Sequence, residues 1–240
     1  MQLHAERRSY VAHLGAAYSR HRTARTDCLS FAPSATSRLE LYDDDPAQPP
    51  KPQPASASEI PIWKTITLGE YKGVNAVRAA LDRVSCPIAV GEWADEILGR
   101  PAFPFSKEKA EVDLVVLSVA DLGFATKGAS LRDIHSHALA LGLELCPSEV
   151  GPVLRLNYLN QPVGEFLHIA MRPIGRYTGE LVDFTLANGG AGLLLVGADG
   201  RPEVILPGAA RFVFVRPRAD TIASDVSPTR KLDVEDLAKR

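Results

Sequence analysis

Runs of alternating or continuous apolar residues predict the strands of this chain. Regular patterning begins near Ile60, and residues 63–69 alternate apolar and polar side chains before Gly69, as a half-buried strand does. Residues 112–119 are apolar on both alternating faces. This second run predicts a strand that is covered on both sides and central in its sheet.

Apolar residues at three- and four-residue spacing predict three helices in the first two thirds of the chain. The first spans residues 74–84, with Asn75 as its cap, and the second spans residues 92–98. The third begins with the capping box Ser130–Asp133 and ends at Gly142. These helices precede most of the predicted strands.

The last third of the chain predicts antiparallel hairpins. Strand-forming runs follow one another at residues 153–158, 164–172, 182–187, 192–197, 203–206 and 211–216. Asn188-Gly189 and Asp199-Gly200 suit tight turns between them. Helices first and hairpins later predict an α+β fold, with a mostly antiparallel sheet and a C-terminal meander packed on two or three helices.

A proline-rich segment divides the chain. Residues 46–54 hold five prolines in nine positions, so we expect an extended linker over residues 43–59 that acts as a spacer. Residues 1–42 precede it as a basic arm, either a short helix or a solvated segment. Residues 60–218 form the predicted globular domain, and residues 219–240 form a charged tail.

Charge and cysteine content narrow the class of protein. With 27 Lys and Arg against 29 Asp and Glu, the overall field does not favour bulk duplex nucleic acid. The three cysteines, Cys28, Cys86 and Cys146, are widely spaced, which is typical of a reducing compartment rather than of a disulfide framework. We find neither a secretory signal nor an apolar run long enough to span a bilayer, so we expect a cytoplasmic protein with no membrane partner.

Five stretches of the chain carry a resemblance to other proteins. They are Trp63–Gly69, Glu92–Phe103, Glu111–Val116, Leu143–Pro152 and Arg211–Arg216. Through them, residues 62–216 resemble a group of bacterial proteins that has no assigned activity. The resemblance implies a bacterial origin, and it carries over no catalytic or binding residue.

The first predicted hairpin presents the main candidate site. If the leucines of residues 153–158 and 164–172 are buried together, the opposite face gathers cationic, amide and ring side chains. These are Arg155, Asn157, Phe166, His168 and Arg172. Such a face suits a phosphate, a carboxylate or an unpaired base, although a solvated outer face has the same pattern. We therefore expect a non-catalytic binding module for a protein or a single-stranded nucleic acid, with no cofactor.

Two incomplete catalytic sets leave an enzyme as the alternative. A hydrolase would use Cys146 as nucleophile with His168 as base. A metal-dependent nuclease would use Glu70, Lys72 and Asp113. Neither set is complete in the sequence.

His135 and His137 invite a metal site, but their spacing argues against one. Residues two apart on a helix point about 200° apart, so the two rings cannot hold one ion. We expect two separate histidines and no metal.

Overall fold

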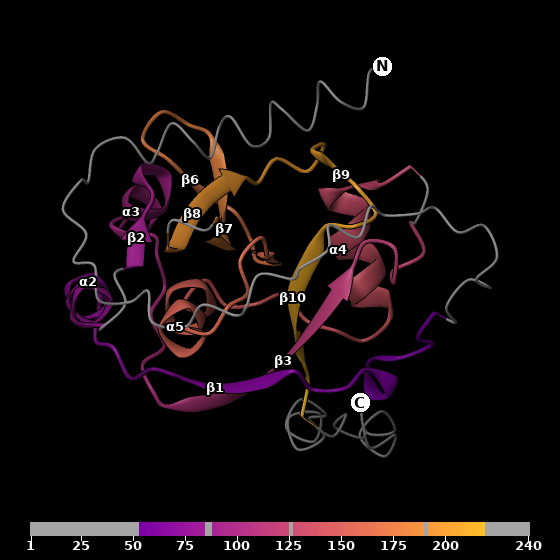
Figure 1. Ribbon diagram of the computed structural model, residues 1–240, viewed down its shortest axis with the longest axis horizontal. Coiled ribbons are helices and arrows are strands. Elements are labelled where there is room, and N and C mark those ends of the chain that lie inside the picture. The colour runs from indigo at the N-terminus through magenta and orange to yellow at the C-terminus, as the bar shows by residue number, and fades with distance from the viewer. Residues whose placement is uncertain (1–52, 85–87, 125–126, 190–191, 219–240) are drawn as a thin grey trace, which may run out of the picture.

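The computed structural model describes residues 53–84, 88–124, 127–189 and 192–218 (Figure 1). The predicted arm and tail, and most of the predicted linker, lie outside these residues. The described part contains four α-helices and a short 3₁₀ turn: α2 (Val74–Arg83), α3 (Glu92–Leu98), α4 (Leu131–Ala140), α5 (Val150–Asn157) and η2 (Ala57–Glu59). Its strands are β1 (Lys64–Leu68), β2 (Ile88–Val90), β3 (Ala110–Ser118), β4 (Ala129–Ser130), β5 (Phe166–Ile169), β6 (Ile174–Gly175), β7 (Leu181–Asn188), β8 (Leu193–Asp199), β9 (Ile205–Leu206) and β10 (Arg211–Arg216).

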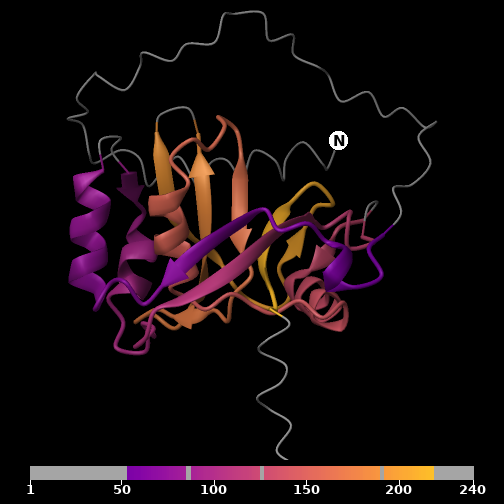
Figure 2. The same ribbon diagram turned by 90° about the horizontal axis from the view of Figure 1, so that it is seen from below.

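The main sheet is mixed and curls into an open half-barrel (Figures 1 and 2). Its strand order is β1-β3-β10-β5-β7-β8-β2, and β6 pairs with β7 beside this path. The pairs β10–β5 and β2–β8 are parallel, whereas the other pairs are antiparallel. Strand β10 therefore returns to the middle of the sheet instead of extending a meander at its end.

The alternation that predicted β1 and β3 is confirmed by the way these strands bury their side chains. Leu114 faces one core while Val115 and Leu117 face the other, so β3 is covered on both sides as predicted. It is not the central strand, because only β1 separates it from the edge of the sheet.

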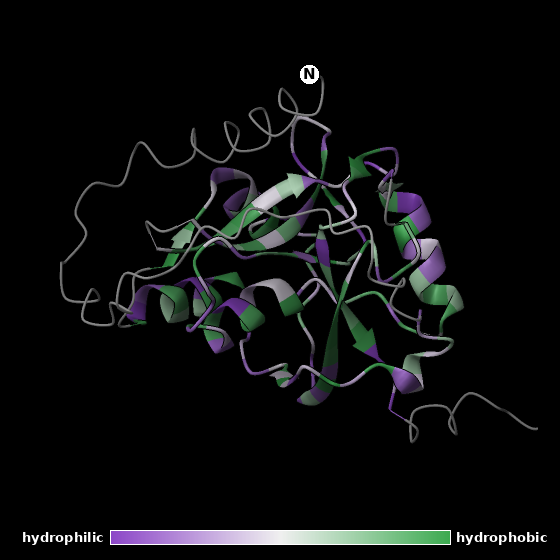
Figure 3. Cartoon of the chain, turned by 45° about the vertical axis from the view of Figure 1, so that its right-hand side comes forward, coloured by the Kyte–Doolittle hydropathy of each residue, from purple (hydrophilic) through white to green (hydrophobic). Residues whose placement is uncertain are grey.

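Two hydrophobic cores hold helices against the sheet. Helices α2, α3 and α5 pack over one face, where Val77, Ile97 and Leu154 are fully buried among strand residues. Helix α4 packs with a second core around Phe212 and Phe214 of β10. Figure 3 shows hydrophobic and hydrophilic residues mixed along the helices, which is typical of helices that bury one side. The fold is therefore α+β, as predicted.

The helix caps were predicted with mixed success. The Ser130 hydroxyl accepts a hydrogen bond from the backbone N–H of Asp133 at the start of α4, so Ser130 is confirmed as the N-cap. The Asp133 carboxylate accepts from the Ser130 hydroxyl, at 2.6 Å, and completes the pair through the side chains. Asn75 was wrong as a cap, since α2 begins at Val74 and Gly73 precedes it with a φ of 117°.

The prediction of a strand over residues 153–158 is wrong, because this segment is helix α5. Its leucines alternate, but Val150, Val153 and Leu154 also follow helical spacing and all three are buried. Pro152 is compatible with the first turn of a helix. Contacts with β1, β7 and β8 hold α5 in place, and a short sequence window does not contain them.

The described chain packs from Ala57 onward. Ala57 is buried in the α4 core, and its backbone N–H donates to Leu141 O at 2.7 Å. The last residues of the predicted linker thus contact the globular part.

Candidate functional site

Arg155 is part of the interior and does not contribute to a surface. It lies on α5 and is 0% exposed. Its guanidinium donates to Gln161 Oε1 at 2.5 Å and to the Tyr158 carbonyl. Burial lowers the pKa of Arg155 to about 10. This arginine ties the end of α5 to the following loop.

His168 is buried on β5, and Phe166 begins the same strand. The His168 ring stacks on Phe212 with centroids 5.0 Å apart, and its Nδ1 lies 3.0 Å from Thr185 Oγ1. Burial lowers the pKa of His168 to about 4. The ring is therefore neutral at pH 7.

The other two candidates of the predicted face, Asn157 and Arg172, are exposed but lie in separate places. Asn157 ends α5 and donates to Val153 O at 2.8 Å, whereas Arg172 follows β5. The predicted single cationic face is wrong in its geometry, because the strand parity on which it rested required residues 153–158 to be extended.

Cys146 and His168 do not form a nucleophile–base pair. Cys146 lies in the core shared with α2, α3 and α5, where its thiol donates to Val213 O at 3.3 Å. His168 contacts Phe212, which belongs to the α4 core on the other face. Burial raises the pKa of the Cys146 thiol, so the reactive thiolate is disfavoured.

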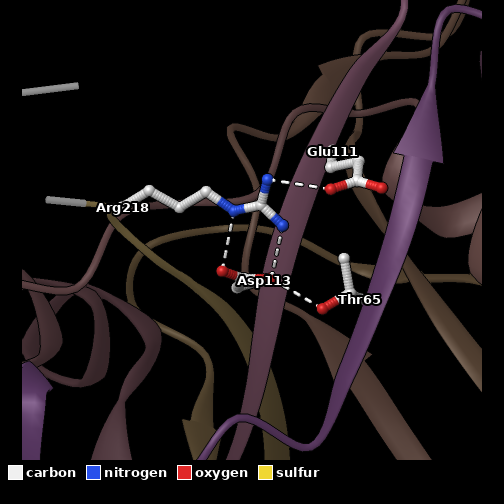
Figure 4. Close-up of polar contacts among 4 residues, drawn as sticks. All are labelled: Thr65, Glu111, Asp113 and Arg218. Carbon is white, nitrogen blue, oxygen red and sulfur yellow. Dashed lines mark hydrogen bonds and ion pairs between the residues drawn. The ribbon is translucent and has the colours of Figure 1, made fainter. Parts of the chain in front are cut away.

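Asp113 belongs to a structural ion-pair network (Figure 4). Arg218 donates to both of its carboxylate oxygens, at 2.8 and 2.9 Å, and also reaches Glu111 at 3.0 Å. Thr65 donates to Asp113 Oδ1 at 2.6 Å. Hydrogen bonds from Arg218 and Thr65 lower the pKa of Asp113 to about 2.

Glu70 and Lys72 lie elsewhere, so the predicted nuclease set is not assembled. Asp113 lies opposite Thr65 in the antiparallel β1–β3 ladder, and Thr65 stands five residues before Glu70 in the chain. Glu70 forms an ion pair with Lys109, and the Lys72 ammonium donates to the carbonyls of Gly69 and Lys107.

The histidines of α4 contact different rings. His135 faces Phe212 edge-on at 6.4 Å, whereas His137 faces Phe124 at 5.6 Å. Within the described ranges, no three His, Cys, Asp or Glu side chains gather into a group that could hold a metal ion.

A hollow of about 470 Å³ opens where β5 ends and α5 begins, and we call it the Arg172 hollow. It lies between the chain leading into α5, the chain from β5 into β6, and the loop between α3 and β3. Its lining residues are Ala102, Pro104, Leu145, Cys146, Pro147, Ser148, Arg172, Pro173, Ile174 and Gly175. Most of this wall is apolar.

Two polar side chains interrupt that wall. Among the described residues that line the hollow, Arg172 alone is charged, and no other described residue pairs with its guanidinium. Ser148 is 8% exposed, and its hydroxyl forms no hydrogen bond within the described part of the chain. The Ser148 oxygen is not among the described side-chain atoms that are buried without a partner, so it remains open to the hollow and to solvent.

Glu149 braces the wall of the Arg172 hollow. It is fully buried, and its carboxylate accepts from Gly69 N at 3.0 Å and from Ser106 N at 2.9 Å. Ser106 lies two residues after Pro104 in the loop that forms one wall. Gly69 has a φ of +76°, and a Cβ there would lie 2.1 Å from Glu108 O, so only glycine fits. Glu149 thus joins α5 to two loops.

A second hollow of about 460 Å³, the Tyr71 hollow, lies at the other end of α5. It is lined by Glu70, Tyr71, Ala80, Arg83, Val84, Leu156 and Asn157. Arg83 and Glu70 bring opposite charges to this hollow, so its lining favours no sign of ligand.

Sequence analysis found Arg172, although by a strand pairing that does not exist, and it missed the roles of Ser148 and Glu149. The available signal was the pair Ser148-Glu149 directly before an apolar run, where polar residues precede a helix. Predicting residues 153–158 as a strand concealed that signal.

Comparison of the chain with known protein families, with curated proteins and with solved structures finds no match. Within the part of the chain that the structure describes, no helix has the length and apolar character to cross a membrane.

Proposed function

We propose that this protein is a non-catalytic binding module whose site is the Arg172 hollow. The observation that carries the proposal is that an exposed arginine, Arg172, and Ser148 line one mostly apolar hollow while neither side chain forms a hydrogen bond or ion pair within the described residues. A guanidinium fork binds planar or tetrahedral anions through paired hydrogen bonds. The ligand is an anion attached to an apolar body.

The size and composition of the hollow fit a small ligand or the end of a longer one. A volume of about 470 Å³ falls within the range of ligand sites, and such sites combine mostly apolar walls with a few polar groups. Pro104, Pro147, Pro173 and Ile174 supply the apolar walls.

Catalysis has less support than binding. The pKa of the Cys146 thiol is raised by burial, and within the described residues no base forms a hydrogen bond to the Ser148 hydroxyl. Both candidate nucleophiles in the hollow therefore lack activation.

Of the two expected partner classes, a protein has more support than a single-stranded nucleic acid. Single-strand binding sites combine several cations with aromatic rings on which bases stack. The described lining of the Arg172 hollow has one cation and no aromatic ring.

Titration with small anions, followed by NMR backbone chemical shifts, tests this proposal. We expect acetate and inorganic phosphate to shift the resonances of Ser148, Arg172 and Gly175, and we expect Arg172→Ala to remove these shifts. Arg83→Ala is the matched control, because Arg83 is also an exposed arginine but lines the Tyr71 hollow. Shifts that persist in Arg172→Ala, or that map elsewhere, contradict the proposal.

A further inference from the structure

Resting on the proposed function, we infer that the Arg172 hollow selects a monoanionic carboxylate with an aliphatic body over a phosphate dianion. Charge, hydrogen-bond donors and the apolar wall of the hollow each favour such a ligand.

The local charges favour a single negative charge on the ligand. Arg172 is one positive charge, and Glu149 places a carboxylate in the residue next to Ser148. Because Glu149 is fully buried, solvent screens its field only weakly. A second negative charge on the ligand therefore meets no second cation among the described lining residues, and the charged residue next to Ser148 in the chain, Glu149, has the same sign as the ligand.

Glu149 also weakens the usual advantage of a helix start for phosphate. The N-terminal end of a helix carries a partial positive charge that attracts anions. In α5 the N-cap residue is itself Glu149, whose carboxylate bonds to Gly69 and Ser106 from other segments. A charged side chain therefore already lies at this helix end.

The hydrogen-bond donors that line the hollow are few enough for one carboxylate to accept from all of them. The Arg172 fork can donate to both oxygens of a carboxylate, and the Ser148 hydroxyl can donate once more. Because the Ser148 hydroxyl makes no hydrogen bond within the described residues and is not fully buried, it is free to donate to a ligand oxygen in the hollow.

The apolar wall adds a desolvation cost that grows with charge. Three prolines and Ile174 leave few groups that could replace the water around an anion. A dianion loses more hydration than a monocarboxylate on entering such a hollow. The same wall gains by covering an aliphatic chain, at roughly 25 cal/mol per Å² of apolar surface.

The same carboxylate chemistry could come from a free organic acid or from the C-terminus of a peptide. N-acetyl-leucine represents the peptide end and isovalerate the free acid, and both offer a similar branched body. Isobutyl phosphate carries a comparable body on a phosphate, and N-acetyl-leucinamide removes the charge.

Isothermal titration at pH 7.5 with these four compounds tests the inference. We expect both carboxylates to bind, isobutyl phosphate to bind at least about tenfold more weakly, and the amide not to bind. A preference for N-acetyl-leucine over isovalerate would identify a peptide end, and the reverse would identify a free acid; either result supports the inference.

Lowering the pH provides an internal control for charge. A phosphate monoester loses its second negative charge as the pH falls below about 6, whereas the carboxylates remain ionised. At pH 5.5 we therefore expect the gap between isobutyl phosphate and the carboxylates to narrow. An unchanged gap would overturn the role assigned to charge.

Variants separate the inference from the proposed function. Arg172→Ala should abolish carboxylate binding, Ser148→Ala should weaken it several-fold, and Arg83→Ala should leave it unchanged. Phosphate binding as tightly as carboxylate at pH 7.5 overturns the inference but leaves an anion site at Arg172. Failure of every anion to bind overturns the proposed function itself.

Discussion

Asp183 is an acidic residue that lies buried inside the protein. Asp183 of β7 is 3% exposed, and its Oδ1 has no hydrogen-bond partner among the described residues. Burial, together with the nearby Asp199, raises the pKa of Asp183 well above its ordinary value. The folded protein therefore keeps this carboxyl protonated at a pH where the unfolded chain ionises it.

Replacing Asp183 should stabilise the protein at neutral pH. Because the folded pKa is raised, stability is lost as pH rises above about 3.9, at about 1.4 kcal/mol for each pH unit over which only the unfolded state is ionised. Asp183→Asn removes that loss, so we expect a larger free energy of unfolding than wild type at pH 7 and little difference at pH 4. Urea unfolding at pH 4 and at pH 7 measures the difference in unfolding free energy between this variant and the wild type.

Asp82→Asn is the matched control, since Asp82 is exposed on α2. Its effect should be small at both pH values. If Asp183→Asn lowers the free energy of unfolding equally at pH 4 and at pH 7, ionisation of Asp183 does not determine its effect on stability. The protein then requires a carboxyl group at this position.

At the scale of elements, α5 connects the two hollows to the core. Its first residues lie beside the Arg172 hollow, and Leu156 and Asn157 line the Tyr71 hollow. Arg155 stabilises its C-terminal end from inside, by donating to Gln161 and to the Tyr158 carbonyl. The strand predicted for this segment would put Arg155 on a surface, where replacing it would change the stability of the protein little.

We expect Arg155→Met to destabilise the protein by about 3 kcal/mol, because it leaves the Gln161 oxygen and the Tyr158 carbonyl without their buried donor. Thermal unfolding followed by circular dichroism measures the effect. The matched control, Arg132→Ala on α4, should change stability by less than about 0.5 kcal/mol, since Arg132 is exposed. If both variants melt at the wild-type temperature, the buried contacts of Arg155 contribute nothing to stability.

At the scale of the whole molecule, acid should act through the α4 core, where His135 and His168 both face Phe212. Burial lowers the pKa values of His135 and His168 to about 4, while the unfolded chain titrates near 6.5. A lowered histidine pKa means that stability is lost as pH falls through the range from about 6.5 to about 4. Asp183 acts in the opposite direction over the same range and reduces the net slope.

We therefore expect the pair His135→Gln and His168→Gln to abolish the rise of unfolding free energy with pH between about 4 and 6.5 and to leave the opposite slope that Asp183 contributes. Urea titrations at half-unit pH steps measure the slope. His137→Gln, on the exposed side of α4, should leave the slope at the wild-type value. A wild-type slope in the double variant would mean that other groups carry the acid sensitivity.

The sequence by itself determined the elements whose signal is local. The N-cap at Ser130 follows from a side chain that can satisfy a free backbone N–H, and the alternation of β1 and the both-sided burial of β3 follow from the side-chain period of strands. The α+β class follows from the order of these patterns. Arg172 was identified as a candidate, but its neighbours in space were not.

Only the tertiary structure decided the rest. Residues 150–157 fit both periods, and packing of Val150, Val153 and Leu154 against the sheet made them a helix. The placement of β10 between β3 and β5, and of Glu149 against Gly69 and Ser106, joins residues far apart in the chain. Such contacts depend on which surfaces meet once the sheet curls, and that information is spread over the whole sequence.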